Sequence, residues 1–309
     1  MHDERTLADL VEFARLEVAA ADIEPWAATL TAMRDPAVVG PAAALSREDA
    51  LWMLTLYNTT DDILSALNIA YVTRSPREWR AAGPRARELA ATVRLSGERR
   101  NLYGGRILNR MDSYAQHVGD RPQVEWFREA LMSRDPLLNF HALLKRLRRV
   151  WGVGRLAAFE WAEFLAKIDA MPVETDDGQL WESSGPRESL ERIYLRPATD
   201  TKQLTAWAYR TKMHLAGEGV DLSWWDFETV ICDFNVMRKG RYYPGKHLAM
   251  ISEEIAGLPE QWRPAWTAAY RAVVPAPWRD LPPGVDKDLC GVYAATGRIR
   301  TPLPQEALP

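Results

Sequence analysis

The sequence Lys145-Arg-Leu-Arg-Arg-Val-Trp-Gly-Val-Gly-Arg-Leu-Ala-Ala-Phe-Glu-Trp161 predicts a helix, a tight turn at Gly152-Val153-Gly154 and a second helix. Glycine adopts positive φ without steric cost, so the two glycines allow a very short turn. The second helix begins with backbone N–H groups that have no partner inside the helix and lie at the positive end of its dipole. We therefore expect a helical hairpin, over about residues 136–170, whose turn can bind one phosphate without reading a base sequence.

The remainder of the chain is also predicted to be helical. Apolar residues recur at helical spacing, while alternating runs of Val, Ile and Thr bounded by turn signals are nearly absent. A first helix opens at Leu7, and a long apolar segment over 46–71 has Ser46 as its N-cap. We expect shorter helices over 84–95, 103–115, 123–132, 136–150, 155–168, 187–194, 202–216, 224–237 and 261–274.

These patterns predict an all-α fold, a single interwoven domain over 1–274 that can have two lobes. No repeat of fixed period, low-complexity segment or Pro/Ser-rich linker divides the chain. The segment 275–309 is expected to be an extension that wraps the surface, because its prolines exclude one continuous helix. These prolines are Pro275, Pro277, Pro282, Pro283, Pro302, Pro304 and Pro309.

The composition is that of an ordinary globular protein, with 309 residues of which 47% are hydrophobic and 26% charged. It excludes a disordered chain, a collagen and a disulfide scaffold. No run approaches about 18 apolar residues, and the N-terminus is acidic where a secretion signal would be basic and then apolar. We therefore expect no membrane segment and a cytoplasmic protein.

Cysteine and histidine are too scattered to predict a metal site. The two cysteines, Cys232 and Cys290, are far apart in sequence, which suits reduced thiols. The five histidines form no pair with Cys or His at ligand spacing, so a zinc site is not expected.

The net charge of −3 hides an uneven distribution along the chain. Between Arg74 and Arg110 there are ten arginines and three acids, and between His141 and Arg155 five basic residues and no acid. The first 24 residues compensate with seven acids and two arginines. Clustered Arg is typical of phosphate contacts, because one guanidinium group pairs with two phosphate oxygens. The two basic runs favour a nucleic acid as partner over a pair of solvated helix faces.

The hairpin resembles the helix-hairpin-helix of the base-excision DNA glycosylase superfamily, in which the hairpin grips the DNA backbone while a base is turned out of the stack. The resemblance implies that the DNA contacts are Lys145, Arg146, Arg149, Gly152, Gly154 and Arg155. The sequence departs from that superfamily in two places. Leu156 stands where lyase-type members have a nucleophilic lysine, and Glu174 replaces the catalytic aspartate, 22 residues after Gly152. The first departure rules out imine chemistry, and the second argues against ordinary N-glycosidic cleavage.

Six short segments follow one another over about residues 45–250. They are Leu51-Trp-Met-Leu-Thr-Leu-Tyr57-Asn-Thr-Thr, Tyr103-Gly-Gly-Arg106, Trp151-Gly-Val-Gly-Arg155, Gly185-Pro-Arg187-Glu-Ser189-Leu, Asp226-Phe-Glu228-Thr-Val-Ile-Cys232 and Arg238-Lys-Gly-Arg241-Tyr-Tyr-Pro-Gly245. In order and spacing they resemble the phage amino acid:DNA transferases, also called α-glutamyl/putrescinyl thymine pyrophosphorylases. The resemblance implies double-stranded DNA whose thymine-derived bases carry a pyrophosphorylated 5-hydroxymethyl group. It also implies an amine co-substrate, an amino acid or a polyamine, that displaces the pyrophosphate in the cytoplasm of a bacterial host.

Substitution at the exocyclic methylene of such a base needs a general base, cations for the pyrophosphate and a pocket for an extruded base. Ser223 as N-cap and Asp226 start a helix that supplies the first of these groups. The buried stripe of that helix consists of Phe227, Val230, Ile231, Phe234 and Met237. Glu228 lies on the neighbouring stripe with Cys232 and Asn235, and a carboxylate at the border of a core can have its pKa raised by burial. We predict Glu228 as the general base, with a structural pairing to an arginine as the alternative.

The predicted cations are Arg187, Lys239 and Arg241, which could hold the pyrophosphate. Arg187 could instead hold an amino-acid carboxylate, and the cations around Arg241 could hold a DNA phosphate or favour the end of the helix. The predicted substrate-binding residues are Tyr57, Arg106, Cys232 and Tyr243. For Tyr57 a core position is the alternative to stacking on a base, and for Cys232 it is that of a packed small side chain.

No cofactor is expected, although Mg²⁺ could accompany the pyrophosphate, and no metal-binding residue is predicted. Two other functions stay open from the sequence. One is a glycosylase-like enzyme that uses Glu174 in place of Glu228 as the key carboxylate. The other is a DNA-binding protein without catalytic activity.

Overall fold

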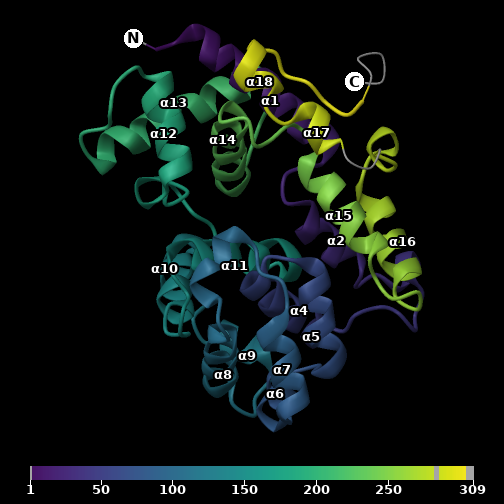
Figure 1. Ribbon diagram of the computed structural model, residues 1–309. Helices are drawn as coiled ribbons and strands as arrows, with labels where there is room; N and C mark the ends of the chain where they lie inside the picture. Colours follow the sequence, from purple (N-terminus) through teal and green to yellow (C-terminus); the bar gives the residue numbers. More distant parts are fainter. Residues whose placement is uncertain (1, 282–284, 304–309) are drawn as a thin grey trace. The chain divides into compact units, whose positions relative to one another are not determined.

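The computed structural model describes residues 2–281 and 285–303, and every regular element in these ranges is a helix (Figure 1). The prediction of an all-α protein is therefore confirmed. The chain divides into two compact units that interleave along the sequence. The hairpin unit consists of Ala27–Glu174 and Glu254–Ala269, and the terminal unit consists of Met1–Trp26, Thr175–Glu253 and Tyr270–Pro309.

The hairpin unit is built around α4, which packs against α5, α8, α9 and α11. Its helices, wholly or in large part, are α2 (Pro25–Ala32), α3 (Pro36–Val39), α4 (Arg47–Thr60), α5 (Ile63–Val72), α6 (Pro76–Ala81), α7 (Pro84–Thr92), the 3-10 helix η1 (Gly97–Leu102), α8 (Arg106–Val118), α9 (Gln123–Arg128), α10 (Pro136–Leu147) and α11 (Arg155–Asp169). Aromatic rings fill the space between these helices. The centroid of the buried Tyr114 ring lies 5.4 Å from that of Trp126 and 5.3 Å from that of Trp161. One aromatic core therefore joins α8, α9 and α11.

The long apolar segment over 46–71 forms two helices rather than one. Ser46 caps the first of them, α4, as predicted. This helix ends where Asp61 takes a left-handed conformation with φ 54°. The carboxylate of Asp62 then accepts a hydrogen bond from Ser65 N and caps α5. Two successive aspartates thus end one helix and start the next, and they turn the backbone within a run that is otherwise apolar.

The terminal unit is built around α14 (Trp224–Arg238), which packs against α1 (Glu4–Ala20), α12 (Ser184–Ile193) and α18 (Val292–Thr296). Its other helices are η2 (Leu180–Glu182), α13 (Thr201–Gly217), η3 (Ala276–Trp278) and α17 (Asp286–Leu289), while α15 (Lys246–Ala256) and α16 (Arg263–Val273) have residues in both units. Ser223 caps α14 as predicted. The predicted stripe of Phe227, Val230, Ile231, Phe234 and Met237 is buried, with no side chain more than 1% exposed.

After residue 274 the described chain contains three short helices, η3, α17 and α18. This agrees with the expectation that prolines prevent one continuous helix there. Four of these prolines, Pro282, Pro283, Pro304 and Pro309, lie outside the described residues.

Candidate functional site

The predicted hairpin is present as α10, a short turn and α11. Gly152 has φ +75°, and a Cβ atom at this position would lie 3.1 Å from Leu102 Cδ2. Only glycine meets both conditions without strain. Gly154 does not use this conformational freedom, because its φ of −84° and ψ of −169° are those of an extended residue and not of a left-handed one. The turn therefore depends on Gly152, while Gly154 serves as the N-cap of α11.

The beginning of α11 has no side-chain cap, because its N-cap is Gly154. The first intrahelical hydrogen bond joins Ala158 N to Gly154 O at 3.1 Å. The N–H groups of the first turn precede that bond and lie at the positive end of the helix dipole. Such a terminus suits a phosphate oxygen, the ligand that the sequence led us to expect there.

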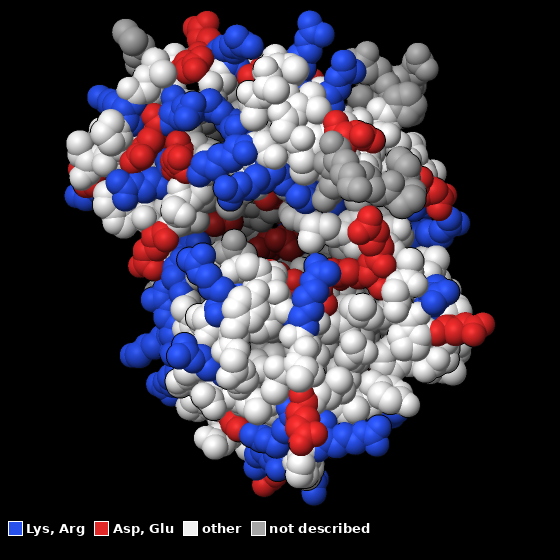
Figure 2. Space-filling view, in the orientation of Figure 1, with Lys and Arg blue, Asp and Glu red and all other residues white. Residues whose placement is uncertain are grey.

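The cations of the hairpin differ in how far they are engaged by the protein itself. Lys145 and Arg149 are exposed, and Figure 2 shows Lys and Arg gathered along the outer side of α10. Arg146 is half-buried, pairs with Glu129 and lies 5.2 Å over the ring of Trp126. Arg155 lies 5.1 Å over the ring of Phe159. Lys145 and Arg149 are therefore the cations best placed to meet a DNA phosphate, while Arg146 and Arg155 also hold the hairpin together.

The basic run between Arg74 and Arg110 is only partly a surface feature. Arg99 and Arg110 are buried, with 2% and 1% of each residue exposed. Arg87 pairs with Asp112. The prediction that the arginines of this run contact phosphates is therefore wrong for Arg99 and Arg110. Arg106 is exposed at the first position of α8, where it can still contact a ligand.

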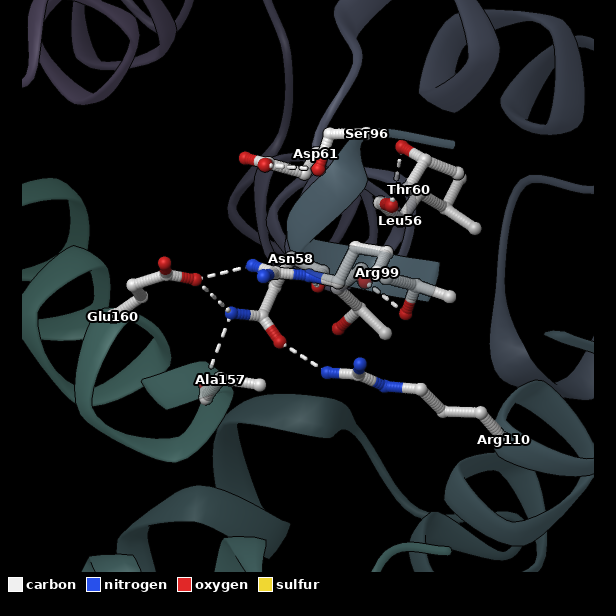
Figure 3. Close-up of polar contacts among 11 residues, drawn as sticks. Leu56, Asn58, Thr60, Asp61, Ser96, Arg99, Arg110, Ala157 and Glu160 are labelled. Atoms are coloured by element: carbon white, nitrogen blue, oxygen red, sulfur yellow. Dashed lines mark hydrogen bonds and ion pairs between the residues drawn. The ribbon is translucent and has the colours of Figure 1, made fainter. Parts of the chain in front are cut away.

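Arg99 and Arg110 belong to a buried polar network with Asn58 and Glu160 (Figure 3). Asn58 Oδ1 accepts a hydrogen bond from Arg110, and its Nδ2 donates to Ala157 O at 2.9 Å and to Glu160 Oε2 at 3.5 Å. Arg99 Nε donates to Asn58 O at 2.7 Å, and its Nη2 pairs with Glu160 Oε2. The four side chains come from α4, η1, α8 and α11, so the network links four elements of the hairpin unit.

Burial shifts the acid–base behaviour of this network. It raises the pKa of Glu160 to about 7, although the charge and hydrogen bond of Arg99 act in the opposite direction. Burial also lowers the pKa of Arg110 to about 9, and the nearby charge of Arg99 adds to this effect. Nε of Arg110 is buried and, within the described part of the chain, has no hydrogen-bond partner. A carboxylate that titrates near neutrality can exchange protons with a substrate under physiological conditions.

In the terminal unit, the stripe of α14 that carries Glu228 faces α12 and the segment before it. Glu228 is 7% exposed, and its Oε1 accepts a hydrogen bond from Ser183 Oγ at 3.2 Å. Further along the stripe, a Cβ atom at Gly185 would lie 3.0 Å from Cys232 Sγ. Asn235 Nδ2 donates to Glu188 Oε2 at 3.1 Å. Glu228, Cys232 and Asn235 therefore share one face, as predicted, and that face is covered by α12.

Two of the predicted cations lie at this pair of helices and are already paired with carboxylates. Arg187 pairs with Glu191 at 2.9 Å and lies 4.5 Å over the ring of Trp181. Lys239 Nζ lies 2.5 Å from Glu188 Oε2. Figure 2 likewise shows Lys and Arg among Asp and Glu over α12 and α14. A bound pyrophosphate would have to compete with these carboxylates for Arg187 and Lys239.

The remaining predicted residues are less well placed to contact a substrate. Arg241 is exposed, three residues beyond the end of α14. Tyr243 is 2% exposed and packs with Ala249 and Val285, so its ring is not open to a base in this structure. Tyr57 is half-buried in the hairpin unit, with its ring centroid 5.7 Å from that of Phe164. This contact favours the core position that was the alternative for Tyr57.

Glu174, the carboxylate of the glycosylase-like alternative, is exposed at the end of the hairpin unit. Its backbone N–H donates to Pro136 O at 3.3 Å. Among the described residues, no group of three or more His, Cys, Asp and Glu side chains could hold a metal ion. None of the described helices is long and apolar enough to span a bilayer.

Sequence reasoning missed the buried network, although three signals for it are visible in the chain. Glu160 lies between Phe159 and Trp161, inside the apolar part of the second hairpin helix. Asn58 follows Tyr57 in an apolar helix. Polar side chains within apolar helical runs need partners, and the basic run with Arg99 and Arg110 offers them. Which arginine meets which carboxylate depends on the tertiary fold.

Fold and side chains together define an all-α protein with a basic helical hairpin in one unit and a buried carboxylate in each. Comparison with protein families narrows the class of protein further. The family model for amino acid:DNA transferase matches residues 37–243, which is more than half of the chain. The chain therefore belongs to the amino acid:DNA transferase family, and it is a transferase that modifies DNA. The comparison with curated proteins finds no match.

Proposed function

We propose that this transferase attaches an amine, from an amino acid or a polyamine, to pyrophosphorylated 5-hydroxymethyl-deoxyuridine in double-stranded DNA and releases pyrophosphate. The observation that carries the proposal is the family match over residues 37–243, because this range includes both the hairpin and the whole of α14. Membership in the family supports DNA and an amino acid as substrates. The modified thymine and the pyrophosphate come from the resemblance of the six sequence segments.

The reaction is a substitution at carbon. The ammonium group of the amine first loses one proton to a base, which frees the nitrogen lone pair. This lone pair attacks the exocyclic methylene carbon, and a C–N bond forms while the C–O bond to the pyrophosphate breaks. The electron pair of the broken bond stays on the departing oxygen. Glu228 is our candidate for that base, because it is a carboxylate in a largely dry environment with one oxygen held by Ser183. Arg187, Lys239 and Arg241 are our candidates for neutralising the pyrophosphate.

DNA binding is assigned to the hairpin unit. The uncapped beginning of α11 and the exposed cations Lys145 and Arg149 suit the phosphate backbone of DNA and read no base sequence. Selection of the target base must then depend on its modification. The base has to leave the stack for an amine to reach its methylene group, so we expect an extruded nucleotide in the productive complex.

The proposal is tested by incubating the protein with duplex DNA that contains pyrophosphorylated 5-hydroxymethyl-deoxyuridine and with single amines: glycine, L-glutamate, L-lysine and putrescine. The DNA is then digested to nucleosides for mass spectrometry. We expect one new nucleoside with the mass of the amine adduct, and one pyrophosphate released per adduct. Unmodified DNA and DNA with plain 5-hydroxymethyl-deoxyuridine are the controls and should stay unchanged.

Two results would contradict the proposal. Free base with abasic sites would show a glycosylase-like activity, for which Glu174 would be the candidate carboxylate. Tight, salt-sensitive binding of DNA without a new nucleoside from any of these amines, and without a difference between modified and unmodified DNA, would show a DNA-binding protein.

A further inference from the structure

We propose that Glu160 binds the ammonium group of the amine co-substrate, an inference that rests on the proposed function. The site is the outward-facing oxygen, Oε1, of a carboxylate that the hairpin unit holds in a fixed position. Asn58, Arg99 and Arg110 are positioning residues, which act on the amine through Glu160.

The first argument is the unequal use of the two carboxylate oxygens. Oε2 of Glu160 accepts hydrogen bonds from both the guanidinium group of Arg99 and the amide group of Asn58. Oε1 receives no hydrogen bond from any residue that the structure describes. The Glu160 side chain is 21% exposed, whereas that of Arg99 is 3% exposed. Figure 3 shows the second oxygen turned away from the other members of the network. The side chain therefore presents one acceptor to a ligand.

The second argument is that this acceptor is held rigidly. A surface glutamate has several rotamers and must lose that freedom when it binds a ligand. Here Arg99 Nε is fixed by Asn58 O at 2.7 Å, and Asn58 Nδ2 is fixed by Ala157 O at 2.9 Å. Arg110 donates a hydrogen bond to Oδ1 of the same Asn58 amide group. The cost of ordering the carboxylate is thus met during folding, which favours binding of a small ligand.

The third argument concerns the sign of the ligand's charge. Two arginines in one network could suggest a site for an anion. However, Arg99 and Arg110 are almost completely buried, and the hydrogen bonds of their side chains run inward to Asn58 and Glu160. What reaches solvent is a carboxylate oxygen, and the nearby charge of Asp61 adds to its negative potential. The site therefore selects a cation that can donate a hydrogen bond, as a primary ammonium group does.

The inference has a definite consequence for the dependence of amine binding on pH. The charged and titratable groups that face Glu160 are Arg99, Asp61 and Arg110 from the neighbouring segments and Glu163 from α11 itself. Burial outweighs the attraction of Arg99 and raises the pKa of Glu160 to about 7. The carboxyl group is therefore mostly protonated at pH 6 and mostly ionised at pH 8. Alkyl ammonium groups stay protonated over this range, so the affinity for an amine should rise about tenfold from pH 6 to pH 8.

The test measures amine binding in the absence of DNA, so that its outcome does not depend on the transfer reaction. Glycine, L-glutamate, L-lysine and putrescine are titrated separately into the full-length protein by calorimetry at pH 6, 7 and 8. At least one of them should bind, with an affinity that rises with pH as described. The variant Glu160→Gln should lose this binding by about tenfold or more, because it removes a charge-assisted hydrogen bond. Glu125→Gln, which removes an equal charge from an exposed position on α9, should bind like the original protein.

A second measurement uses only the unchanged protein, because Glu160→Gln leaves Arg99 buried without its carboxylate and could unfold the hairpin unit. The side-chain carboxyl carbon of Glu160, assigned through its bonds to the backbone of the same residue, is followed by nuclear magnetic resonance during a pH titration. Saturating amine should move the midpoint of that titration to lower pH, since the ammonium group favours the ionised carboxylate.

The inference would be overturned by no binding of any of the four amines, by equal binding in Glu160→Gln and in the original protein, or by a titration midpoint that amine leaves unchanged. Inorganic pyrophosphate serves as the probe for an anion site. Pyrophosphate binding that strengthens in Glu160→Gln would also overturn it. Amine binding that depends on Glu160, together with no transfer product, would instead refute the proposed function alone.

Discussion

Glu228 and Glu160 are both carboxylates on helices whose other residues are mostly apolar, but their surroundings differ. Glu228 is 7% exposed and accepts a hydrogen bond from the hydroxyl group of Ser183. Glu160 pairs with a guanidinium group and presents its second oxygen outward. A carboxylate in a dry environment suits a proton acceptor, while an accessible carboxylate fixed by a cation suits binding. This contrast is the basis for giving the two residues separate roles.

We predict that Glu228→Gln lowers the turnover number by about 10²–10⁴-fold, the usual contribution of a general base, and leaves DNA affinity unchanged. Glutamine keeps the size of the side chain and can still accept the hydrogen bond from Ser183, but it cannot take a proton. The measurement is the rate of adduct formation at saturating amine, beside DNA affinity from fluorescence anisotropy. Glu253→Gln, at an exposed position of the terminal unit, is the control for loss of one negative charge. An equal loss of DNA affinity and turnover in Glu228→Gln would contradict the separate role of this residue.

At the scale of secondary-structure elements, local signals predicted most helices because caps and apolar spacing act within a few residues. Ser46 and Ser223 are N-caps in the structure as in the sequence. The division between α4 and α5 was missed, since Asp61 and Asp62 interrupt an otherwise continuous apolar pattern for only two residues. The helix α15 was also missed, since no helix was predicted between 237 and 261. Sequence patterns therefore predicted which helices exist more reliably than where each helix ends.

The hairpin element provides a prediction about DNA binding. Lys145→Gln and Arg149→Gln should each weaken DNA affinity to a similar degree for all base sequences, because we propose that these exposed cations meet phosphates and not bases. Each substitution should also reduce the slope of log affinity against log salt by about 1. Fluorescence anisotropy over a salt series measures both effects. Lys202→Gln, at an exposed position of the terminal unit, removes an equal charge and should leave the slope unchanged.

Arg146 lies on the same helix and can be compared with Lys145 and Arg149. Its guanidinium group pairs with Glu129 and covers Trp126, so Arg146→Gln should also lower the stability of the protein. We expect its melting temperature to fall, while those of Lys145→Gln and Arg149→Gln stay close to the original. A salt slope that none of the three substitutions changes would show that DNA does not bind along α10.

At the scale of the whole molecule, the distribution of charge could be predicted from the sequence only in part. The uneven charge along the chain is plain from the residues, and the outer side of α10 is basic as expected (Figure 2). The burial of Arg99 and Arg110 could not be predicted, because it depends on Asn58 and Glu160, which are distant from them in sequence. A charged side chain enters a core only with such partners, and partners are chosen by the tertiary fold.

Buried and half-buried carboxyl groups in both units give the protein a common dependence on pH. Burial raises the pKa of Glu160 and of Glu254 to about 7 in the hairpin unit. In the terminal unit it raises the pKa of Asp233 to about 6 and also raises those of Glu17 and Asp22. For each of these groups the folded state binds a proton more tightly than the unfolded chain does. Stability should therefore increase as the pH falls from 8 towards about 5, where these groups take up protons in the folded state only.

We expect the melting temperature at pH 5.5 to exceed that at pH 8 by about 5 °C or more at constant ionic strength. Differential scanning calorimetry at half-unit pH steps measures this trend. Glu254→Gln should flatten part of it, because glutamine can still accept the hydrogen bond from Ile63 N but has no proton to gain. Glu125→Gln, at an exposed position, should leave the trend unchanged. A melting temperature that rises from pH 5.5 to pH 8 would mean that the carboxylates are stabilised by their partners more than burial penalises them. The assignment of Glu160 as a group that titrates near neutrality would then fail as well.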